Sequence, residues 1–143
     1  MTVKRNDFYE RYLRELPEGL TQTVGKLLLR FRGENRSVSR SWLVSMVAVE
    51  MKFVYENQKE FANLDRRVRR AIEILRGSGW LIGSTVSGDG YYICQTWDEY
   101  MAFRASYTSA AYKVIETAKL MDRHALQQLG SDAQLQPALI SEG

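Results

Sequence analysis

The sequence has one cysteine, Cys94, and one histidine, His124, among its 143 residues. A single cysteine excludes a disulfide within the chain, and its apolar and aromatic neighbours are typical of a small buried hydrophobic side chain. A zinc site needs several soft ligands close together, so we expect no metal site. A Ser-His or Cys-His catalytic pair would have to use these two isolated residues. We therefore predict a protein that is not an enzyme and that needs no cofactor.

Long apolar runs are also lacking, since none approaches the roughly 20 residues of a membrane-spanning helix. The N-terminal segment 1–16 is charged where a signal peptide would have its apolar core. The shares of apolar residues, 45%, and of charged residues, 26%, are those of a globular protein. We expect one cytoplasmic domain with appendages and no membrane partner, because the chain is too short for two ordinary domains.

The net charge is only +3, but the basic residues are unevenly distributed. Residues 1–40 hold nine basic and five acidic residues, and residues 65–76 hold five basic and two acidic ones. Residues 77–143 have the opposite balance, with four basic and seven acidic residues. The net charge is too small to establish a nucleic-acid partner, but the positive charge is concentrated in two segments.

Apolar residues at helical spacing predict helices over 6–16, 21–31 and 40–50, with Asn6 as one N-cap and Ser39 or Ser41 as another. The valines of 40–50 leave a strand as an alternative there. Residues 52–62 could continue that helix or form a separate turn of helix. A fourth helix is expected from Asn63 to Gly77, because an apolar stripe follows Asn63 at helical spacing: Leu64, Val68, Ala71, Ile72 and Leu75.

Two β-rich segments, 80–86 and 91–96, flank the turn-forming residues 87–90 and predict a β-hairpin. Thr96 and Glu99 have the spacing of a capping box, and they begin a helix that is uninterrupted to Gly130. At about 1.5 Å per residue this helix would be roughly 50 Å long, which is more than a small domain can cover. The last segment, 131–143, is predicted to be a flexible tail.

The long helix has a seam of aromatic and small side chains along one face. For the first half of the helix, packing of this seam against the chain's own domain is at least as good an explanation as a partner. The seam on the second half needs a partner. We therefore predict a homodimer whose interface uses a heptad series and the alanines beside it: Tyr107, Ala111, Val114, Ala118, Met121 and Ala125.

The arginines of the fourth helix are placed by its buried stripe. With about 100° per residue and Val68 at the centre of the buried face, Arg66 and Arg70 fall opposite it and Arg67 and Arg69 lie on the flanks. These side chains could be ordinary solvent-exposed charges paired with Asp65 or Glu73. The helix has a fifth arginine, Arg76, and two acids cannot neutralise five arginines. The flat guanidinium group of arginine also suits phosphate groups and guanine edges. The four arginines are therefore predicted to bind double-stranded DNA.

The order of two helices, an arginine-bearing helix and a hairpin resembles a winged helix-turn-helix domain. Residues 65–93 are similar to the recognition helix and wing of bacterial and phage winged helix regulators, and of the N-terminal domain of the biotin ligase repressor. The matching positions are Arg66, Val68, Arg69, Ile72, Leu75, Arg76, Gly79, Ile82, Gly90 and Tyr91. One departure is the segment before Asn63, which is longer than the usual turn of the motif.

The resemblance implies a mainly α fold with a small β-hairpin. We expect a leading helix in 1–19, a winged helix-turn-helix domain in 20–96, a long C-terminal helix in 97–130 and the tail in 131–143. Arg36 and Arg40 would hold phosphates near the start of the helix over 40–50. The hairpin tip carries Asp89 and no basic residue, so Ser87 would be its only side-chain contact with DNA.

The expected function is sequence-specific DNA binding by a prokaryotic or phage transcriptional regulator or replication accessory factor, with no small-molecule substrate evident. The alternative is a non-enzymatic protein-interaction module, in which the winged helix is an adaptor and the long helix does the binding. Two features favour that alternative: the excess of acidic residues in 77–143, and the hairpin tip without a basic residue.

Overall fold

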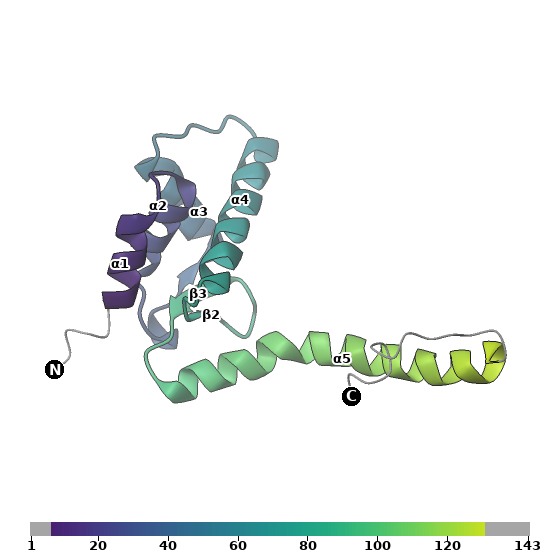
Figure 1. Ribbon diagram of the computed structural model, residues 1–143. Helices are drawn as coiled ribbons and strands as arrows, with labels where there is room; N and C mark the ends of the chain where they lie inside the picture. Colours follow the sequence, from purple (N-terminus) through teal and green to yellow (C-terminus); the bar gives the residue numbers. More distant parts are fainter. Residues whose placement is uncertain (1–6, 131–143) are drawn as a thin grey trace. The chain divides into compact units, whose positions relative to one another are not determined.

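A computed structural model describes residues 7–130, and it is mainly helical with a small three-stranded antiparallel sheet (Figure 1). The chain divides into two units, residues 1–103 and residues 104–143. The elements are, in chain order, α1 (Asp7–Glu15), α2 (Leu20–Leu28), η2 (Glu34–Arg36), β1 (Val38–Ser39), α3 (Arg40–Glu50), α4 (Gln58–Gly77), β2 (Ile82–Ser84), β3 (Gly90–Ile93) and α5 (Trp97–Leu129).

The helices expected over 6–16, 21–31 and 40–50 are confirmed as α1, α2 and α3, although α2 ends at Leu28, before the expected end at Phe31. Helix rather than strand forms over 40–50, and Ser39 is its N-cap, because the Ser39 side chain accepts a hydrogen bond from the Trp42 amide at 3.2 Å. The tail expected in 131–143 lies outside the described residues.

The start that we predicted for the fourth helix was wrong, because α4 begins at Gln58 and not at Asn63. Asn57 is the N-cap, and its side-chain oxygen accepts from the Glu60 amide at 2.9 Å. The Glu60 carboxylate in turn accepts from the Glu56 amide at 2.8 Å. Residues 58–62 of the ambiguous segment therefore belong to the first turns of α4.

The sheet has the strand order β1-β3-β2, and both pairings are antiparallel. The predicted hairpin is confirmed as β2 and β3, with Ile82 opposite Ile93. Strand β1 was not predicted. It pairs with β3 through Val38 and Ser39 only, and Val38 lies opposite Tyr91. This strand joins the start of α3 to the hairpin.

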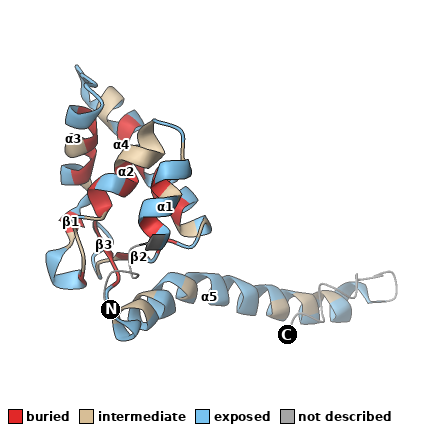
Figure 2. Ribbon diagram, turned by 60° about the vertical axis from the view of Figure 1, so that its left-hand side comes forward, coloured by how far each residue is buried: buried red, intermediate tan, exposed pale blue. Residues whose placement is uncertain are grey.

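One hydrophobic core joins the helices and strands between Tyr9 and Ile93 (Figure 2). Its helical part combines the buried faces of α2, α3 and α4, and the stripe predicted for α4, from Leu64 to Leu75, is buried as expected. A β-carbon at Gly25 would lie 2.8 Å from Leu13 Cδ2 and 3.0 Å from Trp80 Cη2. The glycine therefore lets α1 and Trp80 pack closely against α2.

Arg76 fastens the C-terminal end of α4 to the hairpin. Its Nε donates to the Ile82 carbonyl at 3.0 Å, its Nη2 donates to Ser84 Oγ at 2.8 Å, and its Nη1 pairs with Glu73 at 2.8 Å. The guanidinium carbon also lies 5.0 Å from the centre of the Phe103 ring. With its side chain only 13% exposed, this arginine has a structural role, unlike the others on α4.

The capping box at the start of α5 is confirmed in a modified form. Thr96 Oγ1 accepts from the Glu99 amide at 3.1 Å, as expected. The Glu99 carboxylate, however, accepts from two other backbone amides, Gln95 at 2.7 Å and Glu34 at 2.8 Å. Glu99 therefore connects the start of α5 to η2. The hydrogen bond from the Glu34 amide is the main cause that lowers the pKa of Glu99 below its usual value of 4.5.

This lowered pKa predicts how stability depends on pH. Because the pKa of Glu99 is lower in the folded chain than in the unfolded one, its ionised form stabilises the fold above the usual pKa, and this contribution is lost as the pH falls through the lowered pKa. The loss of unfolding free energy between neutral pH and about pH 3 should therefore be smaller in Glu99→Gln than in the parent. Urea unfolding across this range measures the difference. Asp98→Asn is the control, and an effect as large as that of Glu99→Gln would contradict the assignment.

Candidate nucleic-acid interface

The outer side of α4 carries exposed arginines. The buried stripe centred on Val68 fixes the rotation of the helix, and the side chains of Arg66, Arg67, Arg69 and Arg70 are all exposed as a result. The rotation predicted from the sequence is therefore confirmed, and all four guanidinium groups can meet a partner in solution.

Three of these arginines carry uncompensated positive charge. Arg69 pairs with Asp65 through Nε and Oδ2 at 3.1 Å, as one of the possible local pairs predicted. Glu73 forms its ion pair with Arg76 instead of with Arg69 or Arg70. Within residues 7–130, Arg66, Arg67 and Arg70 form no ion pair. An anionic partner would meet these three without displacing an existing contact.

Arg40 is held by a contact that connects α3 to α4. Its Nε pairs with Asp65 Oδ1 at 3.1 Å, and Asp65 is thus shared between Arg40 and Arg69. A hydrogen bond to Tyr91 is the main cause that raises the pKa of Arg40, with the Asp65 charge adding to it. Arg40 therefore stays charged, but a phosphate would have to compete with Asp65 for its Nε.

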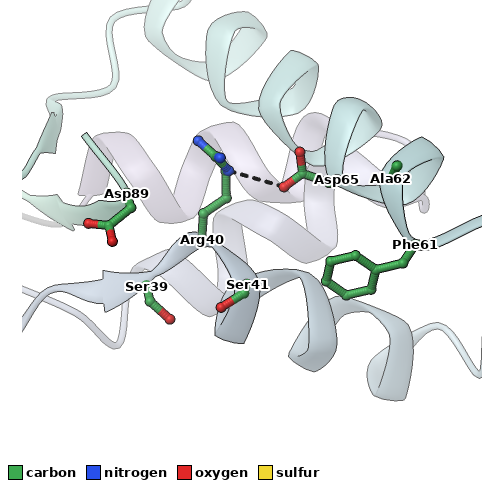
Figure 3. Close-up of a pocket in the computed structure, with 7 residues that line it drawn as sticks. All are labelled: Ser39, Arg40, Ser41, Phe61, Ala62, Asp65 and Asp89. Carbon is green, nitrogen blue, oxygen red and sulfur yellow. Dashed lines mark hydrogen bonds and ion pairs between the residues drawn. The ribbon is translucent and has the colours of Figure 1, made fainter. Parts of the chain in front are cut away.

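A shallow pocket of about 340 Å³ lies where α3, α4 and the hairpin meet (Figure 3). It is lined by Ser39 of β1, by Arg40 and Ser41 from the start of α3, by Phe61, Ala62 and Asp65 from α4, and by Asp89. The Arg40 side chain extends toward Asp65 across this pocket. Two carboxylates and one guanidinium give it a mixed charge, so it is a poorer phosphate site than the outer face of α4.

The hairpin tip offers no positive side chain. Ser87 Oγ donates to Asp89 Oδ1 at 2.5 Å and also lies 3.2 Å from Thr85 Oγ1. The hydrogen bond from Ser87 lowers the pKa of Asp89, so this carboxylate is ionised at neutral pH. The Ser87 hydroxyl that we expected to contact DNA is therefore already hydrogen-bonded to Asp89.

Arg36, the other residue predicted to hold a phosphate, is exposed at the end of η2.

The residues predicted to form a dimer interface lie along α5, which has no buried residue. The side chains of Tyr107, Ala111, Val114, Ala118 and Met121 are exposed, and Ala125 is half-buried. The predicted interface residues therefore lie at the surface of α5.

Cys94 is buried, as the sequence indicated. Burial raises the pKa of its thiol to about 11, so the group is protonated and a poor nucleophile at neutral pH. Within residues 7–130, His, Cys, Asp and Glu side chains do not gather in any group of three or more that could hold a metal ion. Over the same residues, every helix is too short or too polar to span a membrane.

Comparisons with protein-family models, with curated proteins and with solved structures found no match to this chain. The function is therefore inferred from the geometry and charges of the chain itself.

Proposed function

We propose that this chain is a winged helix-turn-helix protein that binds double-stranded DNA through the exposed arginines of α4. The observation that carries the proposal is the set of unpaired guanidinium groups on one outer helix face, those of Arg66, Arg67 and Arg70. The arrangement of α2, α3 and α4 with a small sheet is compatible with the fold that the sequence resembles.

Helix size and charge support the major groove as the site of contact. An α-helix with its side chains is about 10–12 Å across, and the major groove of B-form DNA is about 12 Å wide. Arginine binds phosphate oxygens and the guanine edge through two parallel hydrogen bonds. Arg66, Arg67 and Arg70 would supply these contacts, and Arg69 would join them at the cost of its pair with Asp65.

The hairpin contributes little to this proposal. Its tip is negative because Asp89 is ionised and no basic side chain compensates it. A phosphate close to the tip would be repelled. Arg36, on η2, is the better second contact with the DNA backbone. The wing would therefore position α4 through Arg76 and not read the DNA itself.

Self-association through α5 completes the proposed function. One recognition helix reads a short site weakly, whereas two copies combine two half-sites and gain affinity from effective concentration. Such a dimer would suit a transcriptional regulator or a replication accessory factor of a prokaryote or phage.

The experiment that tests the proposal is binding of the full chain to fluorescently labelled duplex DNA, followed by anisotropy at about 50 mM and about 200 mM salt. A protein that uses three or four phosphate contacts should lose roughly 40-fold to 150-fold in affinity between the two conditions. No binding at the lower salt concentration would refute the proposal.

A protein partner is a second candidate, favoured by exposed apolar side chains on α3. Trp42 and Val49 are 62% and 77% exposed, and they lie about two helical turns apart on the same outer side of α3. Exposed apolar side chains that lie together are typical of a protein interface. If DNA binding is absent, a binding screen against proteins with Trp42→Ala as the control would test this candidate.

A further inference from the structure

The part of α5 within residues 104–129 is a helix without a buried residue and with one strongly apolar face. Its large apolar side chains are exposed, with Val114 at 69% and Met121 at 66%. An isolated helix is only marginally stable in water, and such a face is usually buried against a partner. A second copy of the same helix would meet both needs.

At about 100° per residue, the large side chains of this face fall within about 140° of the helix circumference. We call them the apolar face of α5, and they are Tyr107, Val114, Ile115, Met121, Leu126 and Leu129. The opposite side is mostly polar and includes Lys113, Glu116 and His124, although Leu120, which is 53% exposed, also lies there. The face is therefore continuous along the second unit of the chain.

Two opposite charges lie within this apolar face. Arg104 and Asp122 are about five complete helical turns apart, so they project from the same side of the helix at positions separated by roughly 27 Å along the axis. Neither forms an ion pair with another residue of the described part of the chain. Charges within an apolar face are costly to bury unless they meet opposite charges from the partner.

The positions of these charges select one direction of pairing. In a parallel pair in register, Arg104 would face Arg104 and Asp122 would face Asp122, which is repulsive. In an antiparallel pair, the two helices can cross at the level of Lys113 along their axes, although the Lys113 side chain itself points away from the partner. In this register each Arg104 faces the Asp122 of the other copy, and two ion pairs form. Lys113 is also the midpoint of α5, since the helix runs from Trp97 to Leu129. The same centre thus aligns the helices from end to end.

Side-chain sizes along the seam fit the same register. With Lys113 at the centre, Ala111 of one copy lies opposite Ile115 of the other, and Ala118 lies opposite Thr108. Each small side chain therefore faces a larger one, which permits a close approach of the two backbones.

We propose that two copies of this chain associate through an antiparallel pair of α5 helices centred on Lys113, with reciprocal Arg104–Asp122 ion pairs. This inference rests on the self-association in the proposed function, and it is independent of whether α4 binds DNA. The pairing would fix the direction in which the two copies are joined.

Charge reversal and charge exchange test the pairing. Arg104→Asp alone and Asp122→Arg alone should each raise the dissociation constant of the dimer at least about tenfold, because each creates two repulsive contacts. The double variant with both changes restores opposite charges and should return to within about threefold of the parent. Sedimentation equilibrium measures the dissociation constant of the dimer for the parent, the two single variants and the double variant. Circular dichroism checks that the helix content is unchanged.

The outcomes separate this inference from the proposed function. A monomeric parent would overturn self-association altogether, while DNA binding is measured independently. The antiparallel register alone would be overturned if the parent is a dimer and neither single charge reversal raises its dissociation constant. The same conclusion would follow if the double variant dimerises no more tightly than the single variants.

A cysteine at position 118 gives a second, independent measurement. In the antiparallel register the two copies of residue 118 are about 15 Å apart along the axis, whereas a disulfide needs Cα atoms about 4.4–6.8 Å apart. Ala118→Cys should therefore form no cross-linked dimer by itself, and it should cross-link when mixed with Thr108→Cys. Efficient cross-linking of Ala118→Cys alone would indicate a parallel pair and overturn the proposal.

Discussion

Replacing Arg66 and Arg70 together by alanine is expected to weaken binding to duplex DNA by roughly 100-fold at about 0.1 M salt. Each guanidinium that meets a phosphate or a base edge contributes on the order of 1–3 kcal/mol, and 1.4 kcal/mol corresponds to a factor of ten. Both side chains are exposed and form no ion pair within residues 7–130, so their removal breaks no ion pair in that part of the chain. Fluorescence anisotropy with a labelled duplex measures the change.

The matched control is Arg11→Ala with Arg14→Ala, on α1. Both control residues are exposed, and this pair of changes lowers the net charge by the same amount. Its affinity should stay within about threefold of the parent. If the two double variants lose the same affinity, DNA responds to overall charge and not to the outer face of α4.

Leu28→Ala is expected to lower the free energy of unfolding by about 2–5 kcal/mol. Leu28 lies in α2, is fully buried, and belongs to the core that α2 shares with α3 and α4. Removing three carbon atoms leaves a cavity that the surrounding helices fill only in part. Since total stabilities are typically about 5–15 kcal/mol, this variant should have a markedly lower unfolding midpoint in urea.

Leu81→Ala is the control for that measurement, because Leu81 is 40% exposed and keeps its backbone hydrogen bond from the Cys94 amide in any variant. Its unfolding free energy should fall by less than about half as much as that of Leu28→Ala. Equal losses would contradict the assignment of Leu28 to the centre of the core.

The rotation of α4 could be predicted from the sequence because it depends on local information only. The spacing of Leu64, Val68 and Leu75 fixes the buried side, and Arg66 and Arg70 must then face outward. The hairpin was equally readable, since turn residues lie between two β-rich segments.

The start of α4 was missed although a signal was present. Asn57 is followed by Glu60 at the spacing of a capping box, but the first turns of the helix carry few apolar residues and the stripe begins only at Leu64. The apolar period therefore placed the N-terminus too late.

Tertiary contacts account for the remaining differences. Arg40 meets Asp65 across 25 positions of sequence, and Arg76 meets the Ile82 carbonyl of a strand. Strand β1 has only two residues and depends on a distant partner, Tyr91. No local pattern indicates such contacts, because each depends on how helices and strands pack. They changed the candidate site by engaging Arg40 and by giving Arg76 a structural role.

The most direct test of the central claim is the salt dependence of DNA affinity, measured for the parent and for the Arg66→Ala, Arg70→Ala variant over a series of salt concentrations. Each phosphate contact contributes about −0.9 to the slope of log K against log salt concentration. We predict that the variant has a slope shallower than that of the parent by nearly 2. Identical slopes for the two proteins would show that these arginines do not meet phosphate, and would contradict DNA binding through α4.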